Sequence, residues 1–271
     1  MNVVRRLRIE GLNLGIQAYS AYKGLFYWLT PFSYITNVIV RPLLGMVLFT
    51  TLASFAFGEP AMQRLAIGIP ILASSFIVMS GLTQSYARER DIGTLSLVFS
   101  SPTNRFTHFL SRAALHYPNG LISYACGLFM GWLIVGLDFS QVNWAVFLLS
   151  LCTTVGTLTM FAQMIGVVSI ATRDFANLTY PIVNTMTILS GVIIPLSFFP
   201  TPVAEFARFL PMVNGLEAIR GSFTGLAFSE VGLGAARELL NGVLYLAMGY
   251  SCFALFEKTA KRRGTLELEA G

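Results

Sequence analysis

Residues 86–112 read YARERDIGTLSLVFSSPTNRFTHFLSR, a polar stretch between two long apolar runs. Charged side chains are concentrated in it, at Arg88, Glu89, Arg90, Asp91, Arg105 and Arg112. After the first charged cluster, Ile92, Leu95 and Phe99 follow at spacings of three and four, which predicts a short amphipathic helix that ends at Pro102. A loop that only turned the chain round would need no apolar face, so we expect this helix to dock onto a soluble partner.

The apolar runs on both sides belong to a chain that is poor in charge. Of its 271 residues, 55% are hydrophobic and 11% are charged, whereas soluble domains carry about 25% charged residues. A soluble fold of this size could not bury so much apolar surface, so lipid is the expected solvent. The net charge of +5 is then a consequence of membrane topology, and we expect no nucleic-acid partner.

Six apolar runs have the length of membrane-spanning helices, which need roughly 20 residues. They are residues 34–57, 65–86, 113–136, 144–171, 178–198 and 239–256. Spanning strands would be shorter and would alternate in polarity, so the predicted fold class is all-α, with six transmembrane helices. The third run contains Gly127 and Gly131 in a GxxxG pattern, which is typical of close helix packing.

Lysine and arginine are distributed unequally between the two sides that these spans define. Thirteen of them fall on the side of the termini and of residues 86–112, and four fall on the other side. Cytoplasmic loops carry such an excess. Both termini and the charged stretch are therefore expected to be cytoplasmic, an arrangement that six spans allow.

The same reasoning divides the chain into one membrane domain with two short flanking segments. Residues 1–33 combine basic and aromatic side chains, which suits an N-terminal helix lying in the headgroup layer. Residues 34–257 form the six-span domain, with the amphipathic cytoplasmic helix at about 88–102 and a re-entrant outer segment at about 198–225. Residues 258–271 begin with basic side chains and are expected to form a cytoplasmic tail.

The segment before the last span is apolar but broken by proline. Its breaks are at Pro195, Pro200, Pro202 and Pro211, which leave pieces too short to cross a membrane. Two acid–base pairs in it lie three residues apart and can meet on one helix face; they are Glu205 with Arg208 and Glu217 with Arg220. These features predict two short helices that dip back into the outer leaflet, buried in protein or facing water.

The sequence lacks motifs for chemistry on this chain. It has no GxxxxGK[ST] loop for nucleotide phosphates and no HExxH metal motif, and its three cysteines fall inside expected spans without metal-ligand spacing. The acidic residues near the spans lie at their ends, at Glu59, Asp138, Asp174 and Glu230. An ion-driven carrier needs charge within the membrane, so an ion gradient is not the expected source of energy. We expect no catalytic residue, metal or cofactor on this chain, and a drive that comes from elsewhere.

Two stretches resemble signatures of the type-2 ABC exporter permeases, a family that includes exporters of drugs, lipo-oligosaccharides and polysaccharide chains. The charged stretch is similar to the family's coupling element ExxxGTLExLxxSP, at Glu89, Gly93, Thr94, Leu95, Ser101 and Pro102. Ser96 departs from it, because the family often has an acid there. The segment before the last span resembles the family's outer signature, at Ser190, Gly191, Pro195, Pro211, Arg220 and Gly221.

The resemblance implies a permease that works with a separate ATPase in the bacterial plasma membrane. Two ATPase subunits, which would hold ATP and Mg²⁺, would pair with two permease chains as a homodimer or heterodimer. The amphipathic helix would insert into a cleft of the ATPase, whose closure would tilt the spans joined to it. The residues expected at this contact are Arg88, Glu89, Arg90, Asp91, Gly93, Thr94, Leu95, Phe99 and Arg105. An interfacial helix that touches only lipid is the alternative.

In this family the first and fifth spans meet their symmetry mates and line the path. The candidate path residues here are Asn37, Thr50, Ser54, Asn184, Thr185 and Thr187, and ordinary polar bonding between helices would explain each of them equally well. Short outer turns leave no large domain for a folded protein, so an amphipathic or lipid-linked substrate, a drug, lipid or glycan, is expected. A non-transporting membrane scaffold, an ion-coupled carrier and an importer of the same superfamily are the alternatives.

Overall fold

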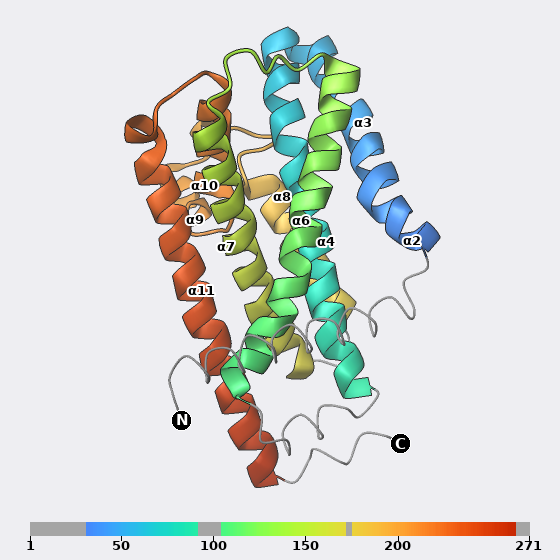
Figure 1. Cartoon of the computed structure of the whole chain (residues 1–271), viewed down its shortest axis with the longest axis vertical. Helices are drawn as coiled ribbons and strands as arrows, with labels where there is room; N and C mark the ends of the chain where they lie inside the picture. The colour runs from blue at the N-terminus through green and yellow to red at the C-terminus, as the bar shows by residue number, and fades with distance from the viewer. Residues whose placement is uncertain (1–30, 92–103, 172–174, 264–271) are drawn as a thin grey trace, which may run out of the picture.

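The computed structural model describes residues 31–91, 104–171 and 175–263, and Figure 1 shows them as an elongated bundle of helices. No strand occurs in these three ranges, so the predicted all-α class is confirmed. The elements are α2 (Pro31–Ile35), η1 (Thr36–Val40), α3 (Arg41–Phe57), α4 (Glu59–Asp91), α6 (Arg105–Val135), α7 (Trp144–Ala171), α8 (Phe175–Leu189), η2 (Leu196–Phe198), α9 (Thr201–Ala207), α10 (Val213–Phe223) and α11 (Phe228–Arg263).

Five of the six expected spans are confirmed as helices long and apolar enough to cross a membrane. They are Thr36–Phe57, Glu59–Glu89, Arg105–Val135, Trp144–Ile170 and Phe228–Thr259. The expected fifth span corresponds to α8, which has 15 residues and is about 22 Å long at 1.5 Å per residue. This is less than the hydrocarbon core of roughly 30 Å, so a sixth crossing stays a prediction.

The flanking segments are described only in part. Residues 1–30, most of the expected N-terminal interfacial helix, and residues 264–271 of the expected tail lie outside the described ranges. The last helix does not end at the expected boundary, because α11 continues without interruption to Arg263. The first residues of the expected tail are therefore helical.

Helix α4 lies at the centre of the bundle, in contact with α3, α6, α7, α8 and α10. Polar side chains along it bond to its neighbours: Ser74 Oγ donates to the carbonyl of Gly120 in α6 over 2.8 Å. The close approach of α6 depends on Gly127, where a Cβ would lie 2.9 Å from the Cβ of Pro70 in α4. The packing role predicted for the GxxxG pattern is confirmed at this glycine.

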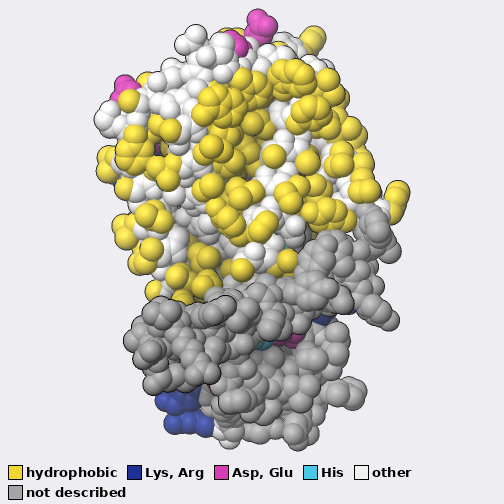
Figure 2. Space-filling model, in the orientation of Figure 1, with side chains coloured by type: hydrophobic (Ala, Val, Ile, Leu, Met, Phe, Trp, Pro, Cys, Tyr) yellow, Lys and Arg dark blue, Asp and Glu magenta, His cyan; other side chains and the backbone are white. Residues whose placement is uncertain are grey.

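The two ends of the bundle differ in charge (Figure 2). The basic end, where α4 and α11 finish and α6 begins, carries Arg88, Arg105, Lys258 and Arg262. The acidic end carries Glu59, Asp138 and Glu230. Between them the described surface is largely hydrophobic, as a surface in contact with lipid must be.

Connections at the acidic end are short. Gly58 alone joins α3 to α4, with a φ of 79° that favours glycine. Between α6 and α7, the backbone N–H and the hydroxyl of Ser140 donate to Asp138 and hold the pKa of this carboxyl below its usual value. These connections place the helices that follow without adding a domain at this end.

The segment between α8 and α11 contains two short helices, α9 and α10; that they dip into the outer leaflet stays a prediction. Helix α10 packs against α7, α11 and α4. At Gly215, near its start, an added Cβ would overlap with Oγ1 of Thr154, which lies ten residues into α7, or about 15 Å along it. Figure 1 accordingly shows α9 and α10 within the length of α7 and α11.

Candidate functional site

At the basic end, an ion pair joins the last turn of α4 to α6. Arg112 is 2% exposed; its Nε donates to Oε1 of Glu89 over 2.9 Å and its Nη2 donates to Oε2. Such bidentate pairing fixes the orientation of both groups as well as their distance. We call the Glu89–Arg112 pair the joint. It connects the two helices between which residues 92–103, the greater part of the expected coupling helix, lie.

The surroundings of the joint extend it to α7. The guanidinium carbon of Arg112 lies 4.2 Å from the centroid of the Tyr86 ring, a cation–π distance, and its Nη2 lies 2.8 Å from Nε2 of His108. Gln163 of α7 donates from Nε2 to the hydroxyl of Tyr86 over 2.7 Å and to the backbone carbonyl of Phe109. Helices α4, α6 and α7 are thus fixed to one another at this end.

The buried charge of Arg112 explains why its partner in the joint is a carboxylate. A buried guanidinium is tolerated only when an opposite charge and hydrogen bonds compensate it, and removing the partner costs up to about 3–5 kcal/mol. The side chain of Glu89 is 26% exposed, so its own desolvation is smaller. Among the described residues, Nη1 of Arg112 has no hydrogen-bond partner.

A second ion pair ties α6 to α11 beside the joint. Nε of Arg105, the first residue of α6, donates to Oε1 of Glu257 over 2.9 Å. The preceding residue, Asn104, caps α6 by accepting the N–H of Phe106 at 3.0 Å. The ring of Phe106 packs edge-on against Tyr250 of α11 at 5.3 Å. The point at which residues 92–103 lead into α6 is therefore anchored on α11.

The expected ATPase-contact residues are only partly within the described structure. Arg88, Glu89 and Arg105 lie at the basic end, on the two helix ends that flank residues 92–103. Arg90 and Asp91 close α4, and nothing further is described of their side chains. Four of the expected contacts lie outside the described residues: Gly93, Thr94, Leu95 and Phe99. Sequence reasoning placed Arg112 in this stretch but missed its pairing with Glu89.

Towards the acidic end, Arg220 of α10 binds backbone carbonyls of two other parts of the chain. Its Nη1 donates to the carbonyl of Gly191 over 2.9 Å, and its Nη2 donates to the carbonyls of Val192 over 3.2 Å and Arg64 over 3.4 Å. Gly191 has a φ of 74°, which turns the chain after α8. One side chain of α10 thus binds both the turn after α8 and the start of α4.

The ion pairs of this segment differ in one respect from the predicted pairs. Glu205 and Arg208 approach to 3.7 Å, as expected. Glu217 lies 3.7 Å from Arg208 instead of pairing with Arg220. The reason is the orientation of α10: Arg220 points to the bundle, where it binds carbonyl groups, while Glu217 is exposed on the side of α9.

Sequence reasoning missed a buried acid, Glu238, because the expected last span began one residue later, at Leu239. In the structure α11 begins at Phe228, and the Glu238 side chain is completely buried. Its Oε1 accepts the N–H of Met212 at 2.6 Å and its Oε2 accepts the N–H of Gly215 at 3.1 Å. The expectation that acids lie only at the ends of the spans was therefore wrong.

Further polar side chains of α11 bind the same turn between α9 and α10. Nδ2 of Asn241 donates to the carbonyl of Arg208 over 3.0 Å, and the hydroxyl of Tyr245 donates to the carbonyl of Phe209. With Glu238 they follow spacings of three and four, so they share one face of the helix. This polar stripe was the signal in the sequence that could have indicated the contact.

The candidate path residues lie on α8 and on the helix that runs from η1 into α3. Three hydroxyl groups bond back to their own helices: Thr50 to Met46, Ser54 to Thr51 and Thr187 to Val183. Asn184 and Thr185 are exposed on α8, and Asn37 is half-buried in η1. Helices α3 and α8 both pack on α4, and each of the three hydroxyl bonds above stays within one helix.

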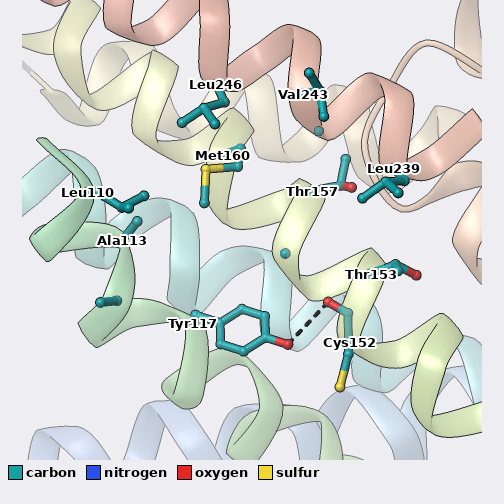
Figure 3. A pocket seen from close by; sticks show the side chains of 13 residues that line it. Leu110, Ala113, Tyr117, Cys152, Thr153, Thr157, Met160, Leu239, Val243 and Leu246 are labelled. Carbon is teal, nitrogen blue, oxygen red and sulfur yellow. Dashed lines mark hydrogen bonds between the residues drawn. The ribbon is translucent and has the colours of Figure 1, made fainter. Parts of the chain in front are cut away.

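A lateral groove with a volume of about 490 Å³ opens between α6, α7 and α11 (Figure 3). Tyr117 reaches from α6 to α7 in it, where its hydroxyl donates to the carbonyl of Cys152 over 3.3 Å. Thr157 donates to the carbonyl of Glu238 over 2.9 Å. These polar groups are satisfied within the protein, and the rest of the lining is mainly apolar, which suits hydrocarbon.

The chain also matches a known protein family. The family described as "ABC-2 type transporter" matches residues 16–224, which include the joint, residues 92–103 and the outer segment as far as the end of α10. No curated protein matches the chain.

Proposed function

This chain belongs to the ABC-2 type transporter family, and from that premise we propose that it is the membrane permease of an exporter driven by a separate ATPase subunit. The observation that carries the proposal is the joint. Residues 92–103 connect two helices whose ends are clamped by the bidentate Glu89–Arg112 pair. A push on this segment would therefore move α4 and α6 together instead of separating them.

The basic end is the side on which we place the ATPase. Positively charged ends of membrane proteins face the cytoplasm, where ATP is available. We call residues 92–103 the docking segment. In this arrangement Arg88 and Arg105 flank it in the sequence, and it contains Gly93, Thr94, Leu95 and Phe99. ATP and Mg²⁺ would be held by two copies of the partner subunit, and both termini would be cytoplasmic.

A second permease chain would complete the path. The long apolar side chains on one side of α3 have no cover from the described residues; they include Leu44, Leu48, Leu52 and Phe55. On α8, Tyr180, Asn184 and Thr185 are likewise exposed. Pairing of two chains through these helices would bring their polar residues towards a shared axis, as the family resemblance implies. The turn between α9 and α10 would then lie within the outer leaflet.

The substrate class that fits best is an amphipathic or lipid-linked molecule. The short connections at the acidic end offer no domain for a folded protein, and the groove between α6, α7 and α11 presents apolar side chains to lipid. An ion-coupled carrier is less well supported, since both carboxylate oxygens of the buried Glu238 bind backbone N–H groups of α10. This acid is occupied as a structural cap.

Purification of the full-length chain with the ATPase subunit that accompanies it would test the proposal. Arg112→Lys keeps the charge but loses the bidentate fork. We expect it to retain the partner while ATP hydrolysis in proteoliposomes falls about tenfold, which corresponds to about 1.4 kcal/mol. Arg208→Lys, in a more exposed ion pair towards the acidic end, is the matched control and should behave as the unmodified chain.

Two outcomes would contradict this function. Transport that persists when the ATPase is inactive would indicate an ion-coupled carrier. Labelling of a cysteine at position 93 by an impermeant maleimide from outside the cell would place the docking segment on the wrong side of the membrane.

A further inference from the structure

The last helix has two carboxylate attachments that lie far apart. Glu257 binds Arg105 at the basic end, and Glu238 binds the start of α10 towards the acidic end. They are nineteen residues apart, or about 28 Å along one helix. We propose that α11 is a rigid link that carries displacement of residues 92–103 to the turn between α9 and α10, with Glu257 and Glu238 as its positioning residues. This inference rests on the function proposed above.

The attachment at the basic end follows residues 92–103 directly in the sequence. Arg105 follows the N-cap Asn104, so it is the first helical residue after residues 92–103. The side chains of Arg105 and Glu257 are 24% and 14% exposed, which limits solvent screening of the pair. Next to it, the Phe109 ring packs on Phe253 at 5.8 Å. Movement of the start of α6 must therefore displace the end of α11.

The attachment towards the acidic end binds a stretch of backbone with an unfavourable conformation. Met212 has a φ of 72°, a left-handed conformation that non-glycine residues rarely adopt. The carboxylate of Glu238 accepts the N–H groups of Met212 and Gly215 and so caps the start of α10, where a negative charge is favoured. Asn241 and Tyr245 bind the carbonyls of the same turn. Movement of α11 therefore takes this turn with it.

Between the two attachments α11 has no built-in hinge. The helix is unbroken from Phe228 to Arg263 and contains no proline. It is pressed against α7, since a Cβ on Gly242 would lie 2.8 Å from Oγ1 of Thr157, and one on Gly249 would lie 3.1 Å from Cα of Met164. Figure 1 shows α11 running along the bundle from the region of α9 and α10 to the basic end. A tilt of α11 at its basic end would therefore also move the turn between α9 and α10, because the helix does not bend in between.

The first experiment measures the accessibility of α9, next to the turn between α9 and α10, during ATP hydrolysis. The full-length chain, purified with its ATPase subunit, has its native cysteines replaced and carries Phe206→Cys on the exposed side of α9. The rate of labelling by fluorescein maleimide is compared with ADP and with ATP plus vanadate. We expect a nucleotide-dependent change that Glu257→Gln abolishes and that the charge exchange Arg105→Glu with Glu257→Arg restores.

The matched control is Glu230→Gln on the same helix. Glu230 also accepts a backbone N–H, that of Ala227 at 2.8 Å, but does not bind the turn before α10. It should leave the nucleotide response unchanged. If the parent complex responds to nucleotide and Glu257→Gln responds equally, the rigid link is wrong while the proposed function stands. If the parent complex shows no response and no ATP hydrolysis, both are overturned.

The second experiment needs no partner and examines the isolated chain. Hydrogen exchange of the Met212 and Gly215 amides should be faster in Glu238→Gln than in the parent, whereas Glu230→Gln should leave these amides unchanged. Unaltered exchange in Glu238→Gln would refute the attachment towards the acidic end. Should Glu238→Gln fail to fold, Asn241→Leu, which removes a single bond to the same turn, is expected to accelerate exchange there, and no acceleration would refute the attachment as well.

Discussion

Arg220 donates from its Nη1 to the carbonyl of Gly191 over 2.9 Å, a contact between residues that are 29 positions apart. It fastens α10 to the turn that follows α8. A hydrogen bond from a charged donor contributes about 1.5–3 kcal/mol, so we expect Arg220→Met to lower the free energy of unfolding by about that amount or more. Thermal unfolding in detergent micelles would measure the loss.

Arg237→Met is the control for this change. Arg237 is an exposed arginine of α11, so its replacement should alter the unfolding temperature little. An equal loss in both variants would mean that the carbonyl contacts of Arg220 contribute nothing specific.

Space for the Arg220 side chain depends on Gly68 in α4. A Cβ at this position would lie 2.9 Å from Nη2 of Arg220 and 2.9 Å from Cγ1 of Val192. Overpacking of this kind costs about 1–3 kcal/mol, and we expect Gly68→Ala to lower stability by that amount in the same measurement.

A neighbouring glycine provides the comparison. At Gly45 in α3 an added Cβ would meet only Cγ2 of Ile69 at 3.8 Å, an ordinary contact. Gly45→Ala should therefore be neutral or stabilising by up to about 1 kcal/mol, because alanine favours helix. If the two alanine variants unfold alike, the packing around Arg220 is looser than the structure indicates.

The joint is expected to behave as a coupled pair. Glu89→Gln leaves the buried Arg112 without a counter-charge, which should cost up to about 3–5 kcal/mol. Adding Arg112→Met removes the stranded charge, so the double variant should be more stable than Glu89→Gln alone. A double-mutant cycle on unfolding free energies measures this coupling.

The more exposed pair of Glu205 with Arg208, at 3.7 Å, supplies the reference cycle. Surface pairs contribute about 0–1 kcal/mol, so its coupling energy should be much smaller. Equal coupling in the two cycles would show that burial does not set the strength of the joint.

The sequence predicted the spans well because long apolar runs are a local property. It also predicted the packing glycine at 127 and the two short helices before the last span, since GxxxG and repeated prolines act within a few residues. The length of α8 was not predictable in this way. The apolar run continues past Leu189, but the chain turns at Gly191, where Arg220 from a distant helix binds its carbonyl.

Long-range polar partners account for the remaining errors. The last span was predicted to begin after Glu238 because an acid is costly in a membrane. Glu238 is buried within α11 because two N–H groups at the start of α10, on residues 23 and 26 positions earlier, offset that cost. The spacing of Glu217 and Arg220 permitted a pair, but the orientation of α10 in the bundle directed Arg220 elsewhere. The stripe of Glu238, Asn241 and Tyr245 indicates that this face of α11 binds polar groups, but not which ones.

The start of α10 gives a last prediction, because its glycine is matched to one side chain. A Cβ at Gly215 would overlap with Oγ1 of Thr154 in α7 and lie 2.9 Å from its Cβ. Gly215→Ala should therefore push α10 away from α7 and weaken the cap that Glu238 provides, with a loss of about 1–3 kcal/mol.

Thr154→Ala should reverse most of this loss. The Thr154 hydroxyl donates only to the carbonyl of Ser150 in its own helix, over 2.5 Å, so its removal costs little and frees the space that the new methyl group needs. Unfolding free energies of the two single variants and the double variant would measure the suppression. If the double variant were no more stable than Gly215→Ala alone, the overlap with Thr154 would not be the reason for glycine at this position, and the contact of α10 with α7 would have to depend on other residues.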